Sequence, residues 1–298
     1  MEQHVLGNGG LLISRIGFGC MSLREDEKAN YRLLHAAIEK GVNFFDTADL
    51  YAQGNNEIMV GKALKEKRKD VVIATKVGNQ LKPDGSGWLW NPRKAYILQA
   101  VNNSLQRLQT DYIDLYQLHG GTMEDDMDEV IEAFSLLQQQ GKIRFYGISS
   151  IRPNVIRSYA YRAAISSVMM QYSLLDRRPE ESALGLLADK NIGVLARGSL
   201  AGGLLVNKPA TAYLNYAEAT VAKAAAAVTA VSGGKRSNTQ TALQFVLQQP
   251  AVTAAIVGIR TMEQLDAAVS ISNTTPLNGN EMDSLRQSVP VNYYKEHR

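Results

Sequence analysis

Short apolar runs recur along nearly the whole chain, separated by segments in which apolar residues recur every three or four positions. The clearest of these segments runs from Met127 to Leu137, where Val130, Ile131 and Phe134 complete one apolar stripe and Gly141 follows as a stop signal. This alternation predicts strands that each lead into a helix. The predicted strands are Ile16 to Gly19, Asn43 to Asp46, Val71 to Lys76, Tyr112 to His119, Ile143 to Ser149, Ser167 to Tyr172, Ile192 to Arg197 and Ala254 to Gly258.

The number and order of these elements predict the fold class. Strand and helix pairs in this order are typical of an α/β protein built as a (β/α)8 TIM barrel, with parallel strands inside and helices outside. Before the first strand, the turn residues 7–10 lie between Val5-Leu6 and Leu11-Leu12-Ile13, which predicts an N-terminal β-hairpin that closes the bottom of the barrel. No linker or change of composition divides the chain, so residues 1–298 are predicted to form a single barrel domain.

Two connections are longer than is usual in compact domains. Residues 78–92, which include Trp88 and Trp90, follow one predicted strand, and residues 204–214 follow another before an alanine-rich segment. Long loops at the carboxyl ends of strands are often functional. The two tryptophans, together with Met21 and Tyr51, can therefore form the walls of an apolar substrate pocket or pack on their own loops.

Composition limits the partners and the cellular compartment that can be expected for the protein. Hydrophobic residues make up 45% and charged residues 20%, and the net charge of +3 gives no electrostatic reason to expect nucleic acid or a membrane as partner. The single cysteine, Cys20, excludes an internal disulfide, and no Cys/His spacing typical of a metal site is present. The N-terminus lacks the features of a secretory signal, and residues 217–231 are interrupted by charges, so we expect a cytoplasmic protein.

Polar residues end three consecutive predicted strands. Asp46 ends the second, Lys76 the third and His119 the fourth, while Tyr51 follows Asp46 after a short loop. In a parallel barrel these ends meet around one mouth. An ammonium beside Tyr51 would lower the pKa of its phenol, and a carboxylate would keep that ammonium charged. With His119 donating to a substrate oxygen, the set predicts a site that polarises and protonates a carbonyl without a metal or a nucleophile.

Each of these residues also has an ordinary structural explanation. Asp46 can cap a turn, Tyr51 can anchor a loop, Lys76 can reach solvent from its strand end, and His119 can be a loop histidine before two glycines. The occurrence of all of them at neighbouring strand ends favours the functional interpretation.

The chain resembles the aldo-keto reductase superfamily, in its bacterial branch, from about Val5 to Leu265. The motifs that carry this resemblance are Gly17-Phe18-Gly19-Cys20-Met21, Asn43-Phe44-Phe45-Asp46-Thr47-Ala48-Asp49-Leu50-Tyr51, Asn56-Glu57 with Val60-Gly61, Ala74-Thr75-Lys76, Asp111 to His119, Gly141-Lys142-Ile143-Arg144 and Tyr146-Gly147-Ile148-Ser149.

The resemblance implies an NADPH-dependent reduction of an aldehyde or ketone to the alcohol. It implies that Asp46, Tyr51, Lys76 and His119 form a catalytic tetrad with Tyr51 as the proton donor, and that the cofactor lies across the barrel mouth. In agreement, no G-x-G-x-x-G motif follows a strand. The cofactor-binding residues implied by family position are Gly19, Cys20, Met21, Asp46, Ser149, Gln171, Arg197, Gly198, Ser199, Leu200, Gly202, Gly258, Arg260 and Gln264.

The chain departs from the common family pattern at several cofactor positions. Ser150 stands where many members carry Asn, and Arg197 stands where an aromatic residue commonly covers the nicotinamide. Met169 occupies a family Gln position, and Gln171, on the same strand face two residues later, can replace it. Ala267-Ala268 replaces a common Glu-Asn pair at the adenine end.

Two other functions remain open from the sequence. A nicotinamide-cofactor-sensing binding module with little turnover would use the same cofactor residues. A Schiff-base aldolase would use Lys76 as a nucleophile, although a nearby Asp46 would keep that lysine charged, whereas a Schiff-base amine must be neutral.

Overall fold

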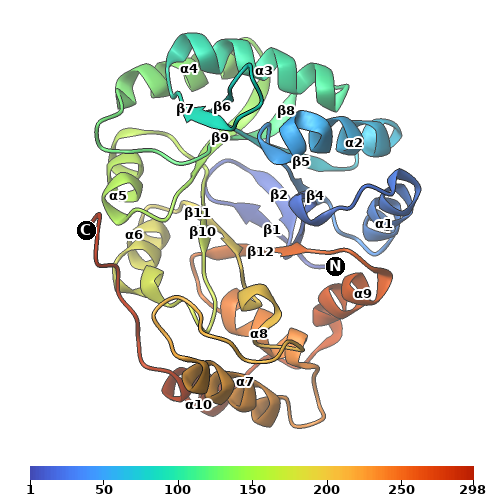
Figure 1. The fold of residues 1–298 in the computed structure, drawn as a ribbon, viewed down its shortest axis with the longest axis vertical. Helices are drawn as coiled ribbons and strands as arrows, with labels where there is room; N and C mark the ends of the chain where they lie inside the picture. The colour runs from blue at the N-terminus through green and yellow to red at the C-terminus, as the bar shows by residue number, and fades with distance from the viewer.

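The computed structural model describes residues 1–298, and eight parallel strands form a closed barrel at its centre (Figure 1). The strands follow one another around the barrel in chain order, and the last pairs with the first to close it. The predicted (β/α)8 barrel is confirmed. Its strands are β3 (Ile16–Gly19), β4 (Phe44–Asp46), β5 (Val72–Val77), β8 (Ile113–Leu118), β9 (Ile143–Ser149), β10 (Ser167–Gln171), β11 (Gly193–Arg197) and β12 (Val252–Gly258).

Helices surround the barrel on all sides in Figure 1. The stripe predicted for α4 is confirmed, because Met127, Val130, Phe134 and Leu137 are buried, and Asp126 caps the helix by accepting from the backbone N–H of Glu129. No helix combines the length and apolar character that crossing a bilayer requires. The helices of this surrounding ring are α1 (Glu27–Glu39), α2 (Asn55–Leu64), α3 (Lys94–Leu108), α4 (Met127–Gln139), α5 (Pro153–Arg162), α6 (Ala183–Asp189), α8 (Asn238–Leu247) and α9 (Met262–Val269).

Two further helices lie outside this ring. The alanine-rich segment forms α7 (Glu218–Ser232), which packs against the C-terminal helix α10 (Gly279–Ser288) at the bottom of Figure 1. From α10 the chain runs back to α5, where the backbone N–H of Asn154 donates to His297 O at 2.8 Å. Neither this helix pair nor the return of the C-terminus follows from the strand and helix pattern.

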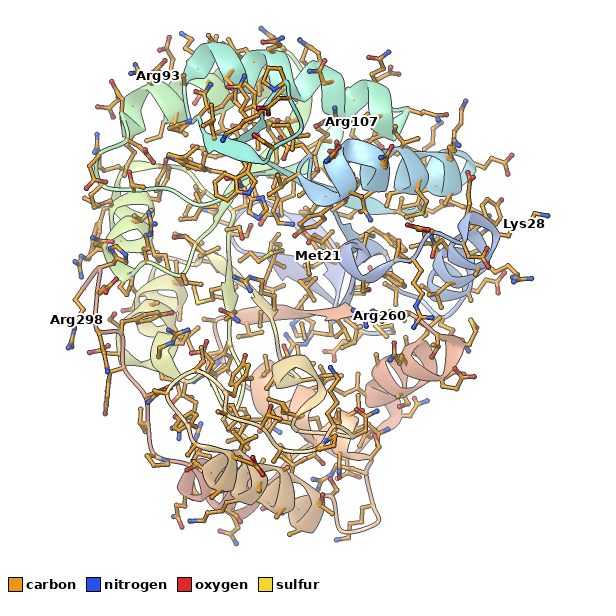
Figure 2. All side chains as sticks on the ribbon, in the orientation of Figure 1. Met21, Lys28, Arg93, Arg107, Arg260 and Arg298 are labelled. Atoms are coloured by element: carbon orange, nitrogen blue, oxygen red, sulfur yellow. The ribbon has the colours of Figure 1, made fainter.

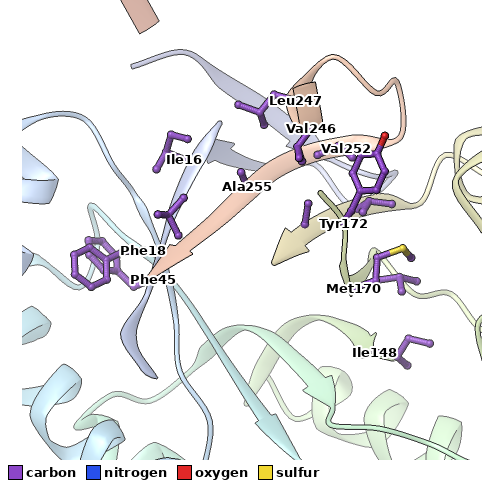
Figure 3. Packing of buried hydrophobic residues seen from close by; sticks show 14 of the residues in the cluster. Ile16, Phe18, Phe45, Ile148, Met170, Tyr172, Val246, Leu247, Val252 and Ala255 are labelled. Atoms are coloured by element: carbon purple, nitrogen blue, oxygen red, sulfur yellow. The ribbon is translucent and has the colours of Figure 1, made fainter. Parts of the chain in front are cut away.

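The main core fills the layer between barrel and helices. Figure 3 shows Val246 and Leu247 of α8 close to Val252 and Ala255 of β12. On the far side of β3, the Phe18 ring stacks on that of Phe45 with centroids 5.9 Å apart. Each strand therefore buries its outward side chains under a helix, which stabilises the barrel through apolar burial.

The N-terminal hairpin closes the bottom of the barrel, as predicted. Its strands β1 (Gln3–Leu6) and β2 (Leu11–Ser14) pair in antiparallel fashion. Leu6, Leu11 and Ile13 are almost fully buried and join the inward-facing barrel residues in a separate apolar cluster. The turn needs glycine at position 7, where φ is +56° and a Cβ would lie 2.3 Å from the carbonyl oxygen of Ser166.

Side-chain alternation carries polar groups to the other end of the barrel. Successive residues of a strand point to opposite faces, so each inward apolar residue is followed two positions later by another inward residue. Near the carboxyl ends these residues become polar. The inward rows are Phe44 and Asp46 on β4, Val72, Ala74 and Lys76 on β5, and Leu115 and Gln117 on β8 with His119 just beyond it.

The long connection after β5 contains a second hairpin that the sequence did not predict. Its strands β6 (Asn79–Leu81) and β7 (Trp88–Trp90) pair in antiparallel fashion. Trp90 Nε1 donates to Asp125 Oδ1 at 2.9 Å, which ties the hairpin to the β8–α4 loop. The tryptophans are therefore held over the barrel mouth by pairing within the loop and by this anchor.

Candidate active site

Lys76 and Asp46 form a buried ion pair at the mouth of the barrel. Lys76 Nζ donates to both carboxylate oxygens of Asp46 at 2.7 Å and to Thr47 O at 2.8 Å. The lysine is 1% and the aspartate 4% exposed. An ammonium has three donors, which these acceptors share with the Tyr51 hydroxyl, so its position is fixed.

Burial has different outcomes for the two groups: it raises the pKa of Asp46, with Lys76 opposing, whereas Lys76 keeps its charge. Burial alone lowers the pKa of Lys76, but the Asp46 carboxylate and Tyr51 outweigh it, so the pKa of the lysine is raised above its ordinary value. Asp46 has a further donor that the sequence analysis missed, since Gln117 Nε2 lies 3.4 Å from Oδ1. The signal for Gln117 was its place two residues before His119, on the same strand face.

The hydroxyl of Tyr51 is the outer end of a hydrogen-bonded chain that begins at Asp46 and continues through Lys76. Lys76 Nζ lies 3.3 Å from Tyr51 Oη. The expected lowering of the tyrosine pKa is not the net result, because burial raises it and the Asp46 carboxylate adds to that effect, while Lys76 only opposes them. Tyr51 is therefore a neutral phenol at neutral pH, with a cation placed to stabilise the phenolate once a proton leaves.

His119 faces Tyr51 across the mouth. The two rings meet edge to face with centroids 6.0 Å apart. Burial, with smaller effects from Lys76 and Arg197, lowers the pKa of His119 to about 3, so the imidazole is neutral and carries one N–H donor. Its Nδ1 is buried without a hydrogen-bond partner in the protein. No hydrogen bond within the protein involves Nε2 either, so Nε2 is the ring nitrogen left for a ligand in the cavity.

These side chains open into a cavity of about 770 Å³. Tyr51, His119 and Asp46 line it, whereas Lys76 lies beneath them. Trp88, Trp90 and Met21 also line it, which confirms them as pocket residues, and Figure 2 shows Met21 over the centre of the barrel. The sequence analysis missed several further lining residues, which are Ser22, Leu50, Asn79, Gly120, Gly121, Thr122, Ile151, Arg152 and Ile256.

The predicted cofactor residues divide into those that line this cavity and those that do not. Three glycines, Gly19, Gly198 and Gly258, expose backbone on the side formed by β3, β11 and β12. Arg197 lines the same side and has no carboxylate within 4.0 Å. Ser149 lines the cavity at the end of β9. The chain therefore provides an open backbone surface with one unpaired cation.

Some residues predicted to bind the cofactor do not present their side chains to this cavity. Cys20 is fully buried with Sγ directed at Phe18 O, because the short helix after β3 turns it into the core. Ser199 is buried and its hydroxyl donates to Ala196 O at 3.3 Å. Gln171 is half-buried one layer above Met169, and Met169 lines the cavity where the glutamine does not. Leu200 and Gly202 also lie outside the lining.

Arg260 and Gln264 belong to a separate region beside α9. Arg260 lines a smaller cavity of about 260 Å³ together with Arg24 and Thr261, and Figure 2 shows it away from Met21. Gln264 is exposed, and its Oε1 accepts from the backbone N–H of Arg260 at 2.8 Å. Arg260 lies two residues beyond Gly258, so the β12 loop connects the two cavities.

A second buried carboxyl group lies behind Tyr51. Asp49 is 6% exposed, and its Oδ1 has no hydrogen-bond partner. Burial and the nearby Glu57 carboxylate raise the pKa of Asp49 to about 8, with Arg107 opposing them. Glu57 itself is fully buried and accepts from Arg107 Nε at 2.7 Å and Thr75 Oγ1 at 2.6 Å. This cluster supports the loop that carries Tyr51.

Comparison with known proteins gives a consistent family relationship. The model of the Aldo/keto reductase family matches residues 15–290. The chain is 47% identical over 307 residues to "Uncharacterized oxidoreductase YqkF" of Bacillus subtilis (strain 168), with 100% of both proteins covered. It is 33% identical over 207 residues to the aldo-keto reductase yakc of Schizosaccharomyces pombe (strain 972 / ATCC 24843), whose name carries "NADP(+)", with 66% of this chain and 61% of that protein covered.

A solved structure shows the same fold over the whole chain. The aldo-keto reductase AKR11C1 from Bacillus halodurans, in its holo form, matches with a TM-score of 0.94 and 46% identity and covers 100% of this chain and 99% of its own.

Proposed function

The chain belongs to the aldo/keto reductase family and is an oxidoreductase of that family, and we propose that it reduces an aldehyde or ketone to the alcohol with NADPH as hydride donor and Tyr51 as proton donor. The observation that carries this proposal is the hydrogen-bonded chain from Asp46 through Lys76 to Tyr51, which ends at the cavity opposite His119.

The side chains have separate tasks in this proposal. His119, being neutral, donates its N–H to the carbonyl oxygen and fixes its position. Tyr51 gives its proton to that oxygen, and the fixed charge of Lys76 stabilises the phenolate that remains. Asp46 keeps Lys76 charged, and Gln117 helps to hold Asp46.

The side of the mouth formed by β3, β11 and β12 suits NADPH. When bound, NADPH supplies the hydride to the carbonyl carbon. Arg197 and the backbone at Gly198 would hold its nicotinamide and diphosphate end, and Ser149 would contact its carboxamide. Arg260, in the smaller cavity beside α9, would face the adenosine phosphate. The NADP(+) in the name of yakc supports this cofactor.

A Schiff-base mechanism is disfavoured by the surroundings of Lys76. Its donors are directed at Asp46, Thr47 and Tyr51, and only 1% of the residue is exposed. A Schiff-base nucleophile needs a free amine with a lone pair that a substrate can reach.

The test is a Tyr51→Phe substitution assayed with a panel of simple aldehydes and ketones. Loss of NADPH absorbance at about pH 7 reports turnover, and fluorescence titration reports cofactor binding. We expect the rate to fall by roughly two to four orders of magnitude, because general-acid catalysis contributes that much, while NADPH affinity stays unchanged. An unchanged rate contradicts the role of Tyr51, and near-zero turnover in the unmodified protein despite tight NADPH binding favours a cofactor-sensing module.

A further inference from the structure

Most arginines that are shielded from solvent pair with a carboxylate, but two arginines at the barrel mouth do not. Arg68, for example, pairs with Asp114 at 2.6 Å, and Arg107 pairs with Glu57 at 2.7 Å. Arg15 instead donates to three backbone carbonyls. Arg152 and Arg197 have no carboxylate partner within 4.0 Å, and both line the large cavity. The shielded arginines that do pair with a carboxylate are Arg68, Arg107, Arg177, Arg178, Arg236 and Arg286.

Arg152 is held in place but remains largely unsatisfied. It follows the end of β9 and immediately precedes α5, and its Nη1 donates to Gly121 O at 2.6 Å. A guanidinium has five N–H donors, so this one bond fixes the side chain against the β8–α4 loop and leaves four donors. A half-buried guanidinium with free donors at a cavity wall is suited to a planar anion, which it can bind in bidentate fashion.

No acidic group of the protein forms an ion pair with Arg152. Asp46 is the only carboxylate that lines the cavity, and it is neutralised by Lys76. Glu124 is the acidic residue whose pKa Arg152 influences, but it is exposed, forms no ion pair with Arg152, and has its pKa lowered mainly by Thr122. The cavity therefore keeps an excess of positive charge that attracts anions.

The two unpaired arginines follow different strands, β9 and β11, with β10 between them. Arg197 ends β11, which pairs with β12, and β12 pairs in turn with β3; these three strands form the side proposed for the cofactor. Arg152 follows β9, which pairs with β8, the strand that leads to His119. In the closed barrel β9 lies opposite β3, and β8 lies opposite β12. Ser149, proposed to contact the carboxamide, ends β9 itself. Arg152 lies three residues further on, and its bond to Gly121 O holds it on the side of His119 and the hairpin of Trp88 and Trp90, where a substrate would extend away from the cofactor.

We propose that Arg152 forms an anion subsite and that the preferred substrates are aldehydes or ketones with an apolar or aromatic body and a carboxylate or phosphate group. This inference rests on the proposed reductase function. Trp88, Trp90 and Ile151 provide the apolar wall between the reacting carbonyl and the anionic group. Because Arg152 contacts the substrate in the ground state and the transition state alike, its contribution falls on KM more than on kcat.

The experiment compares matched substrates with and without charge. One pair is 4-carboxybenzaldehyde and its neutral methyl ester, and the other is 4-formylphenyl phosphate and neutral 4-methoxybenzaldehyde. The unmodified protein is expected to favour the anionic member by about ten- to a hundredfold in kcat/KM, in keeping with a hydrogen-bonded charge pair. The pair in which the protein shows the larger preference for the anionic member indicates whether the subsite prefers a carboxylate or a phosphate.

Substitution then assigns the preference to the residue. Arg152→Gln is expected to remove the preference through KM while the neutral substrates keep their rates, and Arg152→Lys is expected to retain part of it. Arg157→Gln, an exposed arginine on α5 without an ion pair, is the matched control and should change neither value. The neutral substrates also report whether the Gly121 loop has been disturbed.

The outcomes separate this inference from the proposed function. If neutral and anionic aldehydes are reduced equally well, or if Arg152→Gln lowers both rates alike, the anion subsite is refuted and the reductase function stands. If Arg152→Gln weakens NADPH binding in a fluorescence titration, the residue belongs to the cofactor site and the inference is also refuted. If no member of either pair is reduced, the proposed function itself fails.

Discussion

The buried carboxyl of Asp49 gives the protein a dependence of stability on pH that one substitution should remove. The pKa of Asp49 is raised to about 8 by burial and by Glu57, whereas an aspartate in an unfolded chain titrates near ~3.9. Between these values the folded state binds a proton that the unfolded state has lost. Stability therefore is highest below the unfolded pKa and falls as the pH rises toward 8.

The size of this effect follows from the linkage relation. One proton bound only by the folded state changes the free energy of unfolding by about 1.4 kcal/mol per pH unit, or roughly 2.7 kcal/mol between pH 5 and pH 7. His119 acts in the opposite direction, because its pKa of about 3 means that the folded state excludes a proton below the unfolded value of ~6.5. The free energy of unfolding of the unmodified protein, measured against pH, therefore combines the effects of both groups.

The assay is therefore a difference between two proteins. Urea denaturation of the unmodified protein and of Asp49→Asn at pH 5, 6 and 7 gives the change in unfolding free energy at each pH. We expect the amide variant to gain stability relative to the unmodified protein by about 1.4 kcal/mol for each unit of rising pH. Asp189→Asn, at an exposed aspartate without an ion pair, should show no such trend. A difference for Asp49→Asn that stays constant with pH would refute the reasoning.

Three further predictions follow from the site and the core. Because the pKa of His119 is about 3, kcat/KM should show no titration near ~6.5, and an inflection there that disappears in His119→Asn would contradict the assignment. Arg197→Ala should weaken NADPH binding roughly three- to tenfold more than NADP⁺ binding in fluorescence titrations, since a fixed positive charge disfavours the cationic oxidised ring, and equal losses would refute this. Ile13→Ala, in the hairpin that closes the barrel, should lower the urea-measured free energy of unfolding by about 2–5 kcal/mol, whereas Val5→Ala, at a half-exposed position of the same hairpin, should change it by less than about 0.5 kcal/mol.

Much of the fold could be predicted because its signals are local. The positions of the strands, the helix beginning at Met127 and the hairpin around Gly7 follow from side-chain periodicity and turn chemistry, which act over a few residues. The hairpin of residues 79–90 could not be predicted in this way, because a loop rich in glycine and tryptophan has no alternating pattern. Its conformation depends on the contact of Trp90 with Asp125, which is far away in the sequence.

The candidate site was predictable to the extent that it depends on strand ends. Asp46, Lys76 and His119 could be placed together because parallel strands bring their carboxyl ends to one mouth. The direction of a side chain in the loops beyond them could not, as Cys20 shows by turning into the core and Arg152 by turning into the cavity. Loop directions are set by packing against distant segments.

The sequence by itself determined the barrel, its bottom hairpin and the identity of the polar groups at the mouth. Periodicity and strand order can be recognised from local sequence patterns. Only the tertiary structure decided how those groups titrate and which of them lack partners. Burial raises the pKa of Tyr51, although Lys76 acts to lower it. Arg152 is left with free donors because the fold places no carboxylate next to it. Both properties depend on desolvation and on charges brought together across the barrel.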